Sequence, residues 1–407
     1  MSNLTYANFV PLIGGLSLAI KQELGGQKPL YNISYDVFAK NEFYFYNYEK
    51  GVPTYIFEKN DSLTRIKNEV SKYGTPDIIG ALCPCGGLSL LNNTSARGSN
   101  SETNCWMRYF ANLSFQHIKP KAIFMENAPS LYDGSMAEDL RQFFEAAAKK
   151  GGYSIQYVKT DTRFAGIPQQ RKRTYLMAFR DGYGGMKLPE KIPMKYLDDV
   201  VGNDTIGKPL TDLSSSPFYK YMIKTIGKDF RDVIINDVIK KQARCGMLSV
   251  LTYVMKYQNK SFDVLKPYGD DKFKSSIDRL MGKLADNKGF WDYSPLICIG
   301  QVNAVIAKNA IRTIHPTEDR YFTNREIMRL MGMPEDMEPP PADQYNIICQ
   351  NTPVNTSQRM FRVVKNYLEA KDSDKIKGSV IRADDFKDTI VAVAQWRFKT
   401  YKELMHI

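Results

Sequence analysis

A cysteine and a glutamate each follow a short apolar run of this chain, where a folded sheet would present them at a strand end, and two arginines stand just before another such run. A thiolate is a nucleophile, a carboxyl group can exchange a proton, and a guanidinium stabilises negative charge. A free thiol has a pKa of about 8.5, so a nucleophilic Cys85 needs surroundings that favour its thiolate. The first set of candidate catalytic residues is Pro84, Cys85, Glu126, Asn127, Arg171 and Arg173.

The two arginines alternate within the segment GIPQQRKR at 166–173. Alternate residues of a strand lie on one face, so Arg171 and Arg173 can both point into one site. A solvated basic edge is the other interpretation of this segment.

The motif CPC at 83–85 also suits half of a zinc site, but the chain offers no second half. Tetrahedral zinc needs four nitrogen or sulfur ligands, and the remaining cysteines and the three histidines are scattered singly. We therefore expect no metal. Six cysteines in 407 residues are also too few and too dispersed for a disulfide framework, which favours free thiols and a cytoplasmic protein.

These residues need a sheet to hold them, and the first 180 residues have the pattern of one. Short apolar runs alternate with amphipathic stretches, which is typical of a parallel sheet with crossover helices. In an open α/β sheet, ligands bind beyond the carboxyl ends of the strands, where a double glycine at 14–15 and the polar segment 41–43 would join Cys85 and Glu126. We expect a helix at 16–24 and strands at 9–13, 35–42, 76–82, 121–128, 154–162 and 173–180.

Composition and charge favour a folded protein with a polyanionic partner. The chain has 43% hydrophobic residues, 56 Lys and Arg against 44 Asp and Glu, and a formal net charge of +12. Such a surplus attracts phosphates, so nucleic acid is the first candidate; mild basicity without a recognition purpose is the other interpretation. No apolar run approaches the ~20 residues that span a bilayer, and the first residues lack the features of a signal peptide, so we expect no membrane association.

We divide the chain into three regions. Residues 1–181 carry the predicted sheet, 182–318 have weak periodicity with Gly and Pro punctuation, and 319–407 return to helical patterns. We interpret 182–318 as a smaller, separate module. The last region would rejoin the first and end in a helical tail.

Eight short motifs have the order and similar spacing of the motifs of one enzyme family. The chain resembles the DNA cytosine-5 methyltransferases of prokaryotic or phage type over most of its length, except 182–318 and the tail. The resemblance implies an α/β fold, with a class I Rossmann-like catalytic domain that uses S-adenosyl-L-methionine and a smaller mixed target-recognition domain at 182–318. The motifs are IGG at 13–15, NE at 41–42, Asp61, PC at 84–85, EN at 126–127, GIPQQRKR at 166–173, FTNREIMRLMGMP at 322–334 and NTPV at 351–354.

The resemblance also implies a role for each candidate catalytic residue. Family members flip the target cytosine out of double-stranded DNA, and Cys85 matches the thiolate that adds to C6 and activates C5. Glu126 matches the carboxyl group that contacts N3 and the exocyclic amine, and Asn127 would help to position it. Arg171 and Arg173 match the pair that reaches O2 of the base and holds the carboxylate.

Cofactor contacts follow from the resemblance in the same way. The loop at 13–15 would lie beside the methionine moiety, Glu42 on the ribose hydroxyls and Phe43 against the adenine. Asp61 would accept from the adenine amine, and Asn351 would close the pocket. The complete cofactor set is Ile13, Gly14, Gly15, Glu42, Phe43, Asp61, Ser62 and Asn351.

The loop after the nucleophile both fits the family and departs from it. Residues 86–104 are rich in Gly, Ser and Asn and include Arg97, as suits a segment that closes over the flipped base; an ordinary surface loop is the alternative. Gly86 stands where family members have glutamine, and Leu12 stands where the first motif commonly has glycine. The motif is thus a divergent P-C-G in place of P-C-Q.

Because the catalytic cysteine, glutamate and paired arginines remain together, we expect an active but divergent enzyme that works as a monomer on double-stranded DNA. Two alternatives stay open. One is a tRNA methyltransferase of related fold, against which the recognition module of about 130 residues argues. The other is a catalytically silent protein that binds DNA or senses the cofactor.

Overall fold

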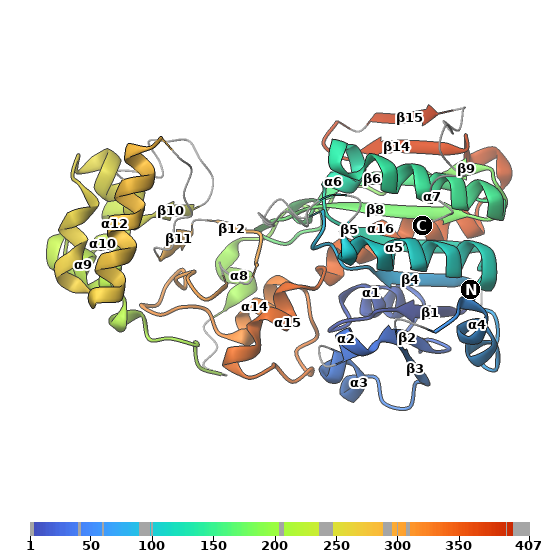
Figure 1. Ribbon diagram of the computed structural model, residues 1–407, viewed down its shortest axis with the longest axis horizontal. Coiled ribbons are helices and arrows are strands. Elements are labelled where there is room, and N and C mark those ends of the chain that lie inside the picture. The colour runs from blue at the N-terminus through green and yellow to red at the C-terminus, as the bar shows by residue number, and fades with distance from the viewer. Residues whose placement is uncertain are drawn as a thin grey trace.

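The computed structural model describes residues 4–39, 42–58, 61–88, 98, 101–202, 207–235, 247–287, 295–298, 300–306, 310–387 and 389–393. Its core is a nine-stranded sheet of order β15-β14-β6-β8-β5-β4-β1-β2-β3 (Figure 1). The strands are β1 Tyr6–Phe9, β2 Asn32–Tyr35, β3 Thr54–Phe57, β4 Ile78–Leu82, β5 Ala122–Asn127, β6 Ser154–Asp161, β8 Lys172–Phe179, β14 Val380–Asp384 and β15 Thr389–Val393.

Strand direction brings the candidate residues to one edge of this sheet. Strands β1 to β5 are parallel to one another, and β8 is antiparallel to both β5 and β6. Strand β6 therefore runs in the same direction as β5. The carboxyl ends of β1, β2, β4, β5 and β6 consequently share an edge, where an α/β sheet binds its ligands. The predicted α/β fold is confirmed.

Helices cover both faces of the sheet, as its buried strands require. On one face, Phe110 and Phe143 pack with sheet residues such as Ile123. On the other face, Leu16 and Phe361 pack with residues such as Phe124. The first face carries α4 Leu63–Ser71, α5 Glu102–Asn112 and α7 Glu138–Gly151, and the second carries α1 Gly15–Glu23 and α16 Val354–Glu369 (Figure 1).

A second module with its own core lies apart from the sheet, at the left of Figure 1. Its described part is mainly helical, with one small antiparallel ribbon. Its elements are α9 Pro217–Thr225, α10 Phe230–Ile234, a 3-10 helix at Phe262–Tyr268, α12 Asp271–Ala285, and the strands β10 Met247–Ser249 and β11 Leu296–Cys298.

A third apolar cluster joins the module to the sheet edge. It unites Ile13 and Phe45 from the edge loops with Val201 and Met328 from the intervening helices. Further contact comes from β7 Gln169–Gln170, which pairs in parallel with β12 Val302–Asn303. The intervening helices are α8 Leu197–Val201, α14 Asn324–Leu330 and α15 Tyr345–Cys349.

Two predicted strands end earlier than expected. The strand predicted at 9–13 stops at Phe9, because Val10 has a left-handed φ of 52° and Pro11 offers no backbone N–H. The strand predicted at 35–42 lies instead at Asn32–Tyr35, and short helices follow at α2 Asp36–Ala39 and α3 Phe43–Tyr48.

The helical tail was also predicted wrongly for the described residues. Helix α16 ends at Glu369, and β13 Ile376–Lys377, β14 and β15 follow it. Strand β14 pairs with β6 over five residues of each strand, so this segment extends the central sheet. Residues 394–407 lie outside the described ranges.

None of the helices that the structure describes is long and apolar enough to cross a membrane.

Candidate active site

The loop that carries Cys85 begins where β4 ends and is held by the end of β5. The side chain of Asn127 donates from Nδ2 to the backbone oxygen of Cys83 at 3.2 Å, and its Oδ1 accepts from the N–H of Ala128 at 2.9 Å. The N–H of Leu88 donates to the oxygen of Cys85 at 3.0 Å and closes a turn after Cys85. Asn127 therefore positions the loop through its backbone.

Glu126 and Arg173 form the charged pair of the site. The Nε atom of Arg173 lies 2.6 Å from Oε1 of Glu126, and both side chains are largely buried. Burial raises the pKa of Glu126, and the charges of Arg173 and Arg171 oppose that rise. Glu126 consequently holds a proton more readily than an exposed glutamate does.

Arg171 serves a different purpose from Arg173, although the two are neighbours on the chain. Its guanidinium is buried and donates to three backbone oxygens, those of Val305 at 2.6 Å, Cys349 at 3.1 Å and Asn351 at 2.6 Å. Burial lowers its pKa to about 9, so the group stays charged at neutral pH. Arg171 thus ties two distant segments to the site, a role that the alternating pattern did not reveal.

The thiol of Cys85 is protonated at neutral pH in this environment. Burial raises its pKa, Arg173 opposes the rise, and the nearby carboxylate of Glu126 adds to it. The described cysteines are Cys83, Cys85, Cys105, Cys298 and Cys349, and all are free thiols.

The glycine loop after β1 leaves no room for side chains. A Cβ on Gly15 would lie 2.0 Å from the oxygen of Thr352, and the N–H of Gly15 donates to Oδ1 of Asn351 at 3.0 Å. Gly14 adopts φ 99°, and a Cβ there would lie 2.3 Å from the ring of Phe45. The structure therefore brings the loop at 13–15 and Asn351 together.

Glu42 lies under this loop. Its side chain is fully buried, accepts from the N–H of Leu12 at 3.4 Å and from the hydroxyl of Tyr46, and has a pKa raised to about 7 by burial. Leu12 itself has a left-handed φ of 52°, which is unfavourable for a residue other than glycine. Glu42 thus holds a strained part of the loop.

Asp36 is a candidate that the sequence reasoning missed. It follows β2 directly and its side chain is exposed, in the place where a Rossmann-like fold presents the acid for ribose hydroxyls. The predicted strand at 35–42 placed Glu42 at the strand end instead. The signal available was the Asp directly after the short run NISY at 32–35.

Phe43 and Phe45 point in different directions from α3. Residues two apart on a helix differ by about 200°, and it is Phe45 that packs against Gly14. Phe43 is 57% exposed and lines a hollow of about 420 Å³ with residues such as Tyr48 and Glu338. The structure does not bring Phe43 to the glycine loop.

Asp61 and Ser62 organise the start of α4. Asp61 pairs with Arg65 at 2.5 Å and accepts from the N–H of Glu58 at 3.0 Å, while Ser62 caps the helix by accepting from the N–H of Arg65 at 3.2 Å. The backbone oxygen of Asp61 accepts from Tyr109 at 2.8 Å. These contacts fix both residues at the end of β3.

An aromatic cluster that the sequence reasoning did not single out lies beside them. The ring of Tyr35 lies 3.6 Å from that of Trp106 and 4.1 Å from that of Phe57, measured between centroids. The buried hydroxyl of Tyr35 has no hydrogen-bond partner among the described residues. A buried polar atom of this kind suits a bound polar ligand.

Other predicted features fall outside the described residues. These are Asn41, Arg97 and most of the loop at 86–104.

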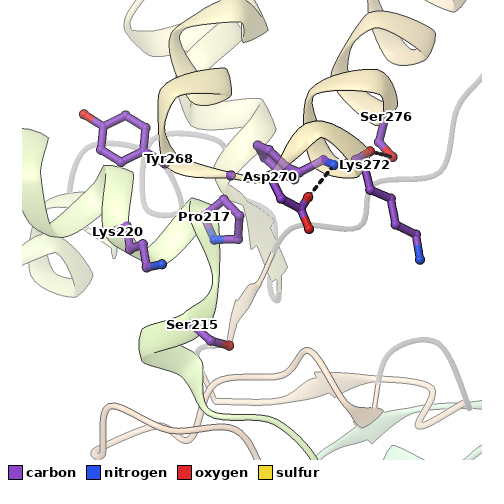
Figure 2. Close-up of a pocket in the computed structure, with 9 residues that line it drawn as sticks. Ser215, Pro217, Lys220, Tyr268, Asp270, Lys272 and Ser276 are labelled. Carbon is purple, nitrogen blue, oxygen red and sulfur yellow. Dashed lines mark hydrogen bonds between the residues drawn. The ribbon is translucent and has the colours of Figure 1, made fainter.

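A hollow of about 440 Å³ lies away from these residues, on the helical module (Figure 2). It opens between α9 and the start of α12, and Lys220 and Lys272 help to line it. Asp270 caps α12 by accepting from the N–H of Phe273 at 2.8 Å. Because this carboxylate already occupies the positive end of the helix, the hollow is poorly suited to an anion.

The sheet and the ligand edge at the carboxyl ends of its strands define a Rossmann-like α/β fold. Solved structures share this fold. An Entamoeba histolytica methyltransferase aligns with a TM-score of 0.54 and 15% identity over 91% of this chain and 100% of its own. A variant of Spodoptera frugiperda DNMT2 aligns with a TM-score of 0.53 and 14% identity over 89% of this chain and 99% of its own.

The chain belongs to the C-5 cytosine-specific DNA methylase family, whose model matches residues 8–366. It is 28% identical to the type II methyltransferase M.MspI of a Moraxella species over 217 residues, which are 52% of this chain and 48% of M.MspI. It is 24% identical to the type II methyltransferase M.XorII of Xanthomonas oryzae over 345 residues, 79% of this chain and 74% of M.XorII. The chain thus matches about half the length of the first relative and three quarters of the second.

Proposed function

We propose that this protein methylates C5 of cytosine in double-stranded DNA, with Cys85 as the nucleophile. The observation that carries the proposal is the placement of Cys85 after β4, beside the Glu126–Arg173 pair. Glu126 lies at the carboxyl end of β5 and Arg173 at the amino end of β8. This arrangement supplies a thiol, a proton donor and a cation at one edge of the sheet. Family membership supports the same reaction.

Cys85, Glu126 and Arg173 each have a separate role in the proposed reaction. Cytosine C5 is too weakly nucleophilic to be methylated directly, so the thiolate of Cys85 forms a bond to C6 and moves electron density to C5. Glu126, whose raised pKa favours a bound proton, donates to N3 and limits the charge that develops on the ring. Arg173 stays beside both groups and stabilises their negative forms.

The adduct then breaks down without consuming the enzyme. After C5 takes up the methyl group, it loses its proton to a base, and the electron pair of that C–H bond forms the C5–C6 double bond. The bond between Sγ and C6 breaks, Cys85 leaves as a thiolate, and the proton on N3 returns to Glu126. Asn127 keeps the loop at 83–85 in place throughout, because its contact is to backbone.

Residues at the same edge fit the expected cofactor. The glycine loop allows close backbone approach, Asp36 stands exposed after β2, and the hydroxyl of Tyr35 lacks a partner among the described residues. We assign the ribose hydroxyls to Asp36 and assign Glu42 to support of the loop. When bound, S-adenosyl-L-methionine supplies the methyl group.

Nucleoside mass spectrometry tests the proposal. DNA and, in parallel, tRNA are incubated with S-adenosyl-L-methionine and the protein, its Cys85→Ser variant, or the matched control Cys105→Ser, which changes an exposed thiol. We expect 5-methylcytosine in DNA with the parent and the control and none with Cys85→Ser. Calorimetry should show nearly unchanged cofactor binding by Cys85→Ser.

Methylation by Cys85→Ser at the parent rate would refute the assignment of the nucleophile. 5-Methylcytosine in tRNA alone would replace the proposed substrate. No modification of either by the parent would favour the catalytically silent alternative.

A further inference from the structure

Residues 191–196, of sequence KIPMKY, form an exposed strip of two lysines, three apolar residues and a tyrosine. All six residues are exposed. The exposed fractions are 40% for Ile192, 42% for Met194 and 77% for Tyr196. A lone exposed apolar residue needs no explanation, but three within six residues of one segment form a patch of the kind that marks an interaction site.

The strip is fixed in place despite its exposure. The N–H of Ile192 donates to the oxygen of Phe164 at 2.9 Å, and the N–H of Lys195 donates to that of Gly166 at 3.1 Å. Leu197 follows directly and is buried in the cluster that joins the module to the sheet. The strip is therefore a preformed surface, which binds at a smaller entropic cost than a mobile segment.

Its position relative to the nucleophile follows from the sheet order. The strip is bonded to residues 164–166, which follow the carboxyl end of β6, at the same edge as Cys85. Between β4 and β6 lie β5 and β8, so at ~4.8 Å per strand the two strand ends are about 14 Å apart. That span corresponds to about four nucleotides of a DNA strand at ~3.4 Å each.

Charge identifies the partner. Every charged side chain within 191–196 is a lysine, and the nearest acidic residues, Glu190, Asp198 and Asp199, lie outside the strip. Two lysines that flank apolar side chains, with a tyrosine beside them, suit a nucleic-acid strand, because phosphates attract the amines and bases or sugars cover the apolar atoms.

We infer that the strip at 191–196 binds the DNA beside the target cytosine, about four nucleotides from the flipped base. Lys191 and Lys195 contact phosphates, and Tyr196 packs against a base or sugar. This inference rests on the proposed function and adds to it a contact outside the catalytic residues and the helical module.

Binding experiments at several salt concentrations test the inference with the full chain. The probes are two duplexes that contain one cytosine mapped in the methylation assay, extending either three or ten base pairs on each side of it. On the long duplex, Tyr196→Ala should raise Kd about tenfold with an unchanged salt slope. The double variant Lys191→Gln, Lys195→Gln should lower the slope of log K against log salt by about 1.8.

The short duplex and a matched variant provide the controls. On the short duplex, which ends before the strip, the variants should bind as the parent does. Tyr73→Ala with Lys72→Gln changes an exposed tyrosine and lysine before the amino end of β4, and it should match the parent on both duplexes. When the methylation rate is measured over a range of DNA concentrations, Tyr196→Ala should keep the parent kcat and raise the KM for DNA.

Three results would overturn the inference. They are equal binding of the strip variants and the parent to the long duplex, equal losses on both duplexes, and a loss of kcat without a change in KM. Failure of the parent itself to bind or methylate DNA would instead refute the proposed function, so the two failures are distinguishable.

Discussion

Replacing Arg171 by lysine should damage the protein in a way that the same change at Arg173 does not. The guanidinium of Arg171 donates to three buried backbone oxygens, and an ammonium group at the end of a flexible chain cannot reproduce this fork. If lysine keeps one contact, two oxygens lose a charged donor at a cost of about 1–3 kcal/mol each. Part of that cost is offset because the guanidinium no longer has to be buried.

We therefore expect Arg171→Lys to lower the free energy of unfolding by about 3 kcal/mol. The change should also weaken cofactor binding, because Arg171 holds the backbone of Asn351, whose side chain bonds to Gly15. Arg173→Lys keeps a cation beside Glu126, so it should lower the free energy of unfolding by less than Arg171→Lys does, while its loss of geometry lowers kcat.

Urea unfolding followed by circular dichroism measures the stability difference, and calorimetry measures cofactor binding. Lys172→Gln, which alters the exposed residue between the two arginines, is the matched control and should resemble the parent in both measurements. Equal stability of Arg171→Lys and Arg173→Lys would refute the division of roles that we draw between the two arginines.

Three further predictions follow from burial and close packing. Gly15→Ala should abolish cofactor binding and lower the unfolding temperature, because the new Cβ would lie 2.0 Å from the oxygen of Thr352. Burial raises the pKa of Glu42 to about 7, so the protein takes up a proton on folding, and its free energy of unfolding falls as pH rises from about 4.5 to 7. Glu42→Gln should remove this fall, as measured by urea unfolding at several pH values. Glu126→Gln should lower the pH at which Cys85 becomes reactive toward iodoacetamide, and an unchanged profile would contradict the coupling of these two groups.

The sequence predicted the sheet edge better than it predicted the contacts made there. Apolar runs located β4, β5, β6 and β8 within a few residues, because strands that helices cover on both faces leave a continuous apolar signal. The segment at 35–42 misled because its apolar residues also suit a short helix, so the strand end lies at Tyr35 rather than near Glu42. Our proposal therefore assigns the ribose to Asp36 in place of Glu42. The pairing of β14 with β6 joins residues more than 200 positions apart, which local patterns do not encode.

The sequence also predicted the roles of Arg171 and Arg173 only in part. Alternation on a strand predicted a shared face, and both side chains are indeed largely buried near Glu126. Nothing in GIPQQRKR indicates that Arg171 would meet the oxygens of Val305, Cys349 and Asn351, since these come from segments at least 134 residues away.

The pKa values of Cys85 and Glu126 are both raised, and both groups lie beside the cation of Arg173. The carboxylate of Glu126 disfavours the thiolate of Cys85, and Arg173 stabilises the negative form of either group. While Glu126 is ionised, its carboxylate pairs with the guanidinium of Arg173 and disfavours the thiolate of Cys85. In the proposed mechanism, Glu126 binds a proton to present to N3 of the base, and the charge of Arg173 then becomes available to the thiolate of Cys85. We therefore expect ionisation of Cys85 to be coupled to protonation of Glu126, so that both groups reach the forms that the proposed reaction needs together.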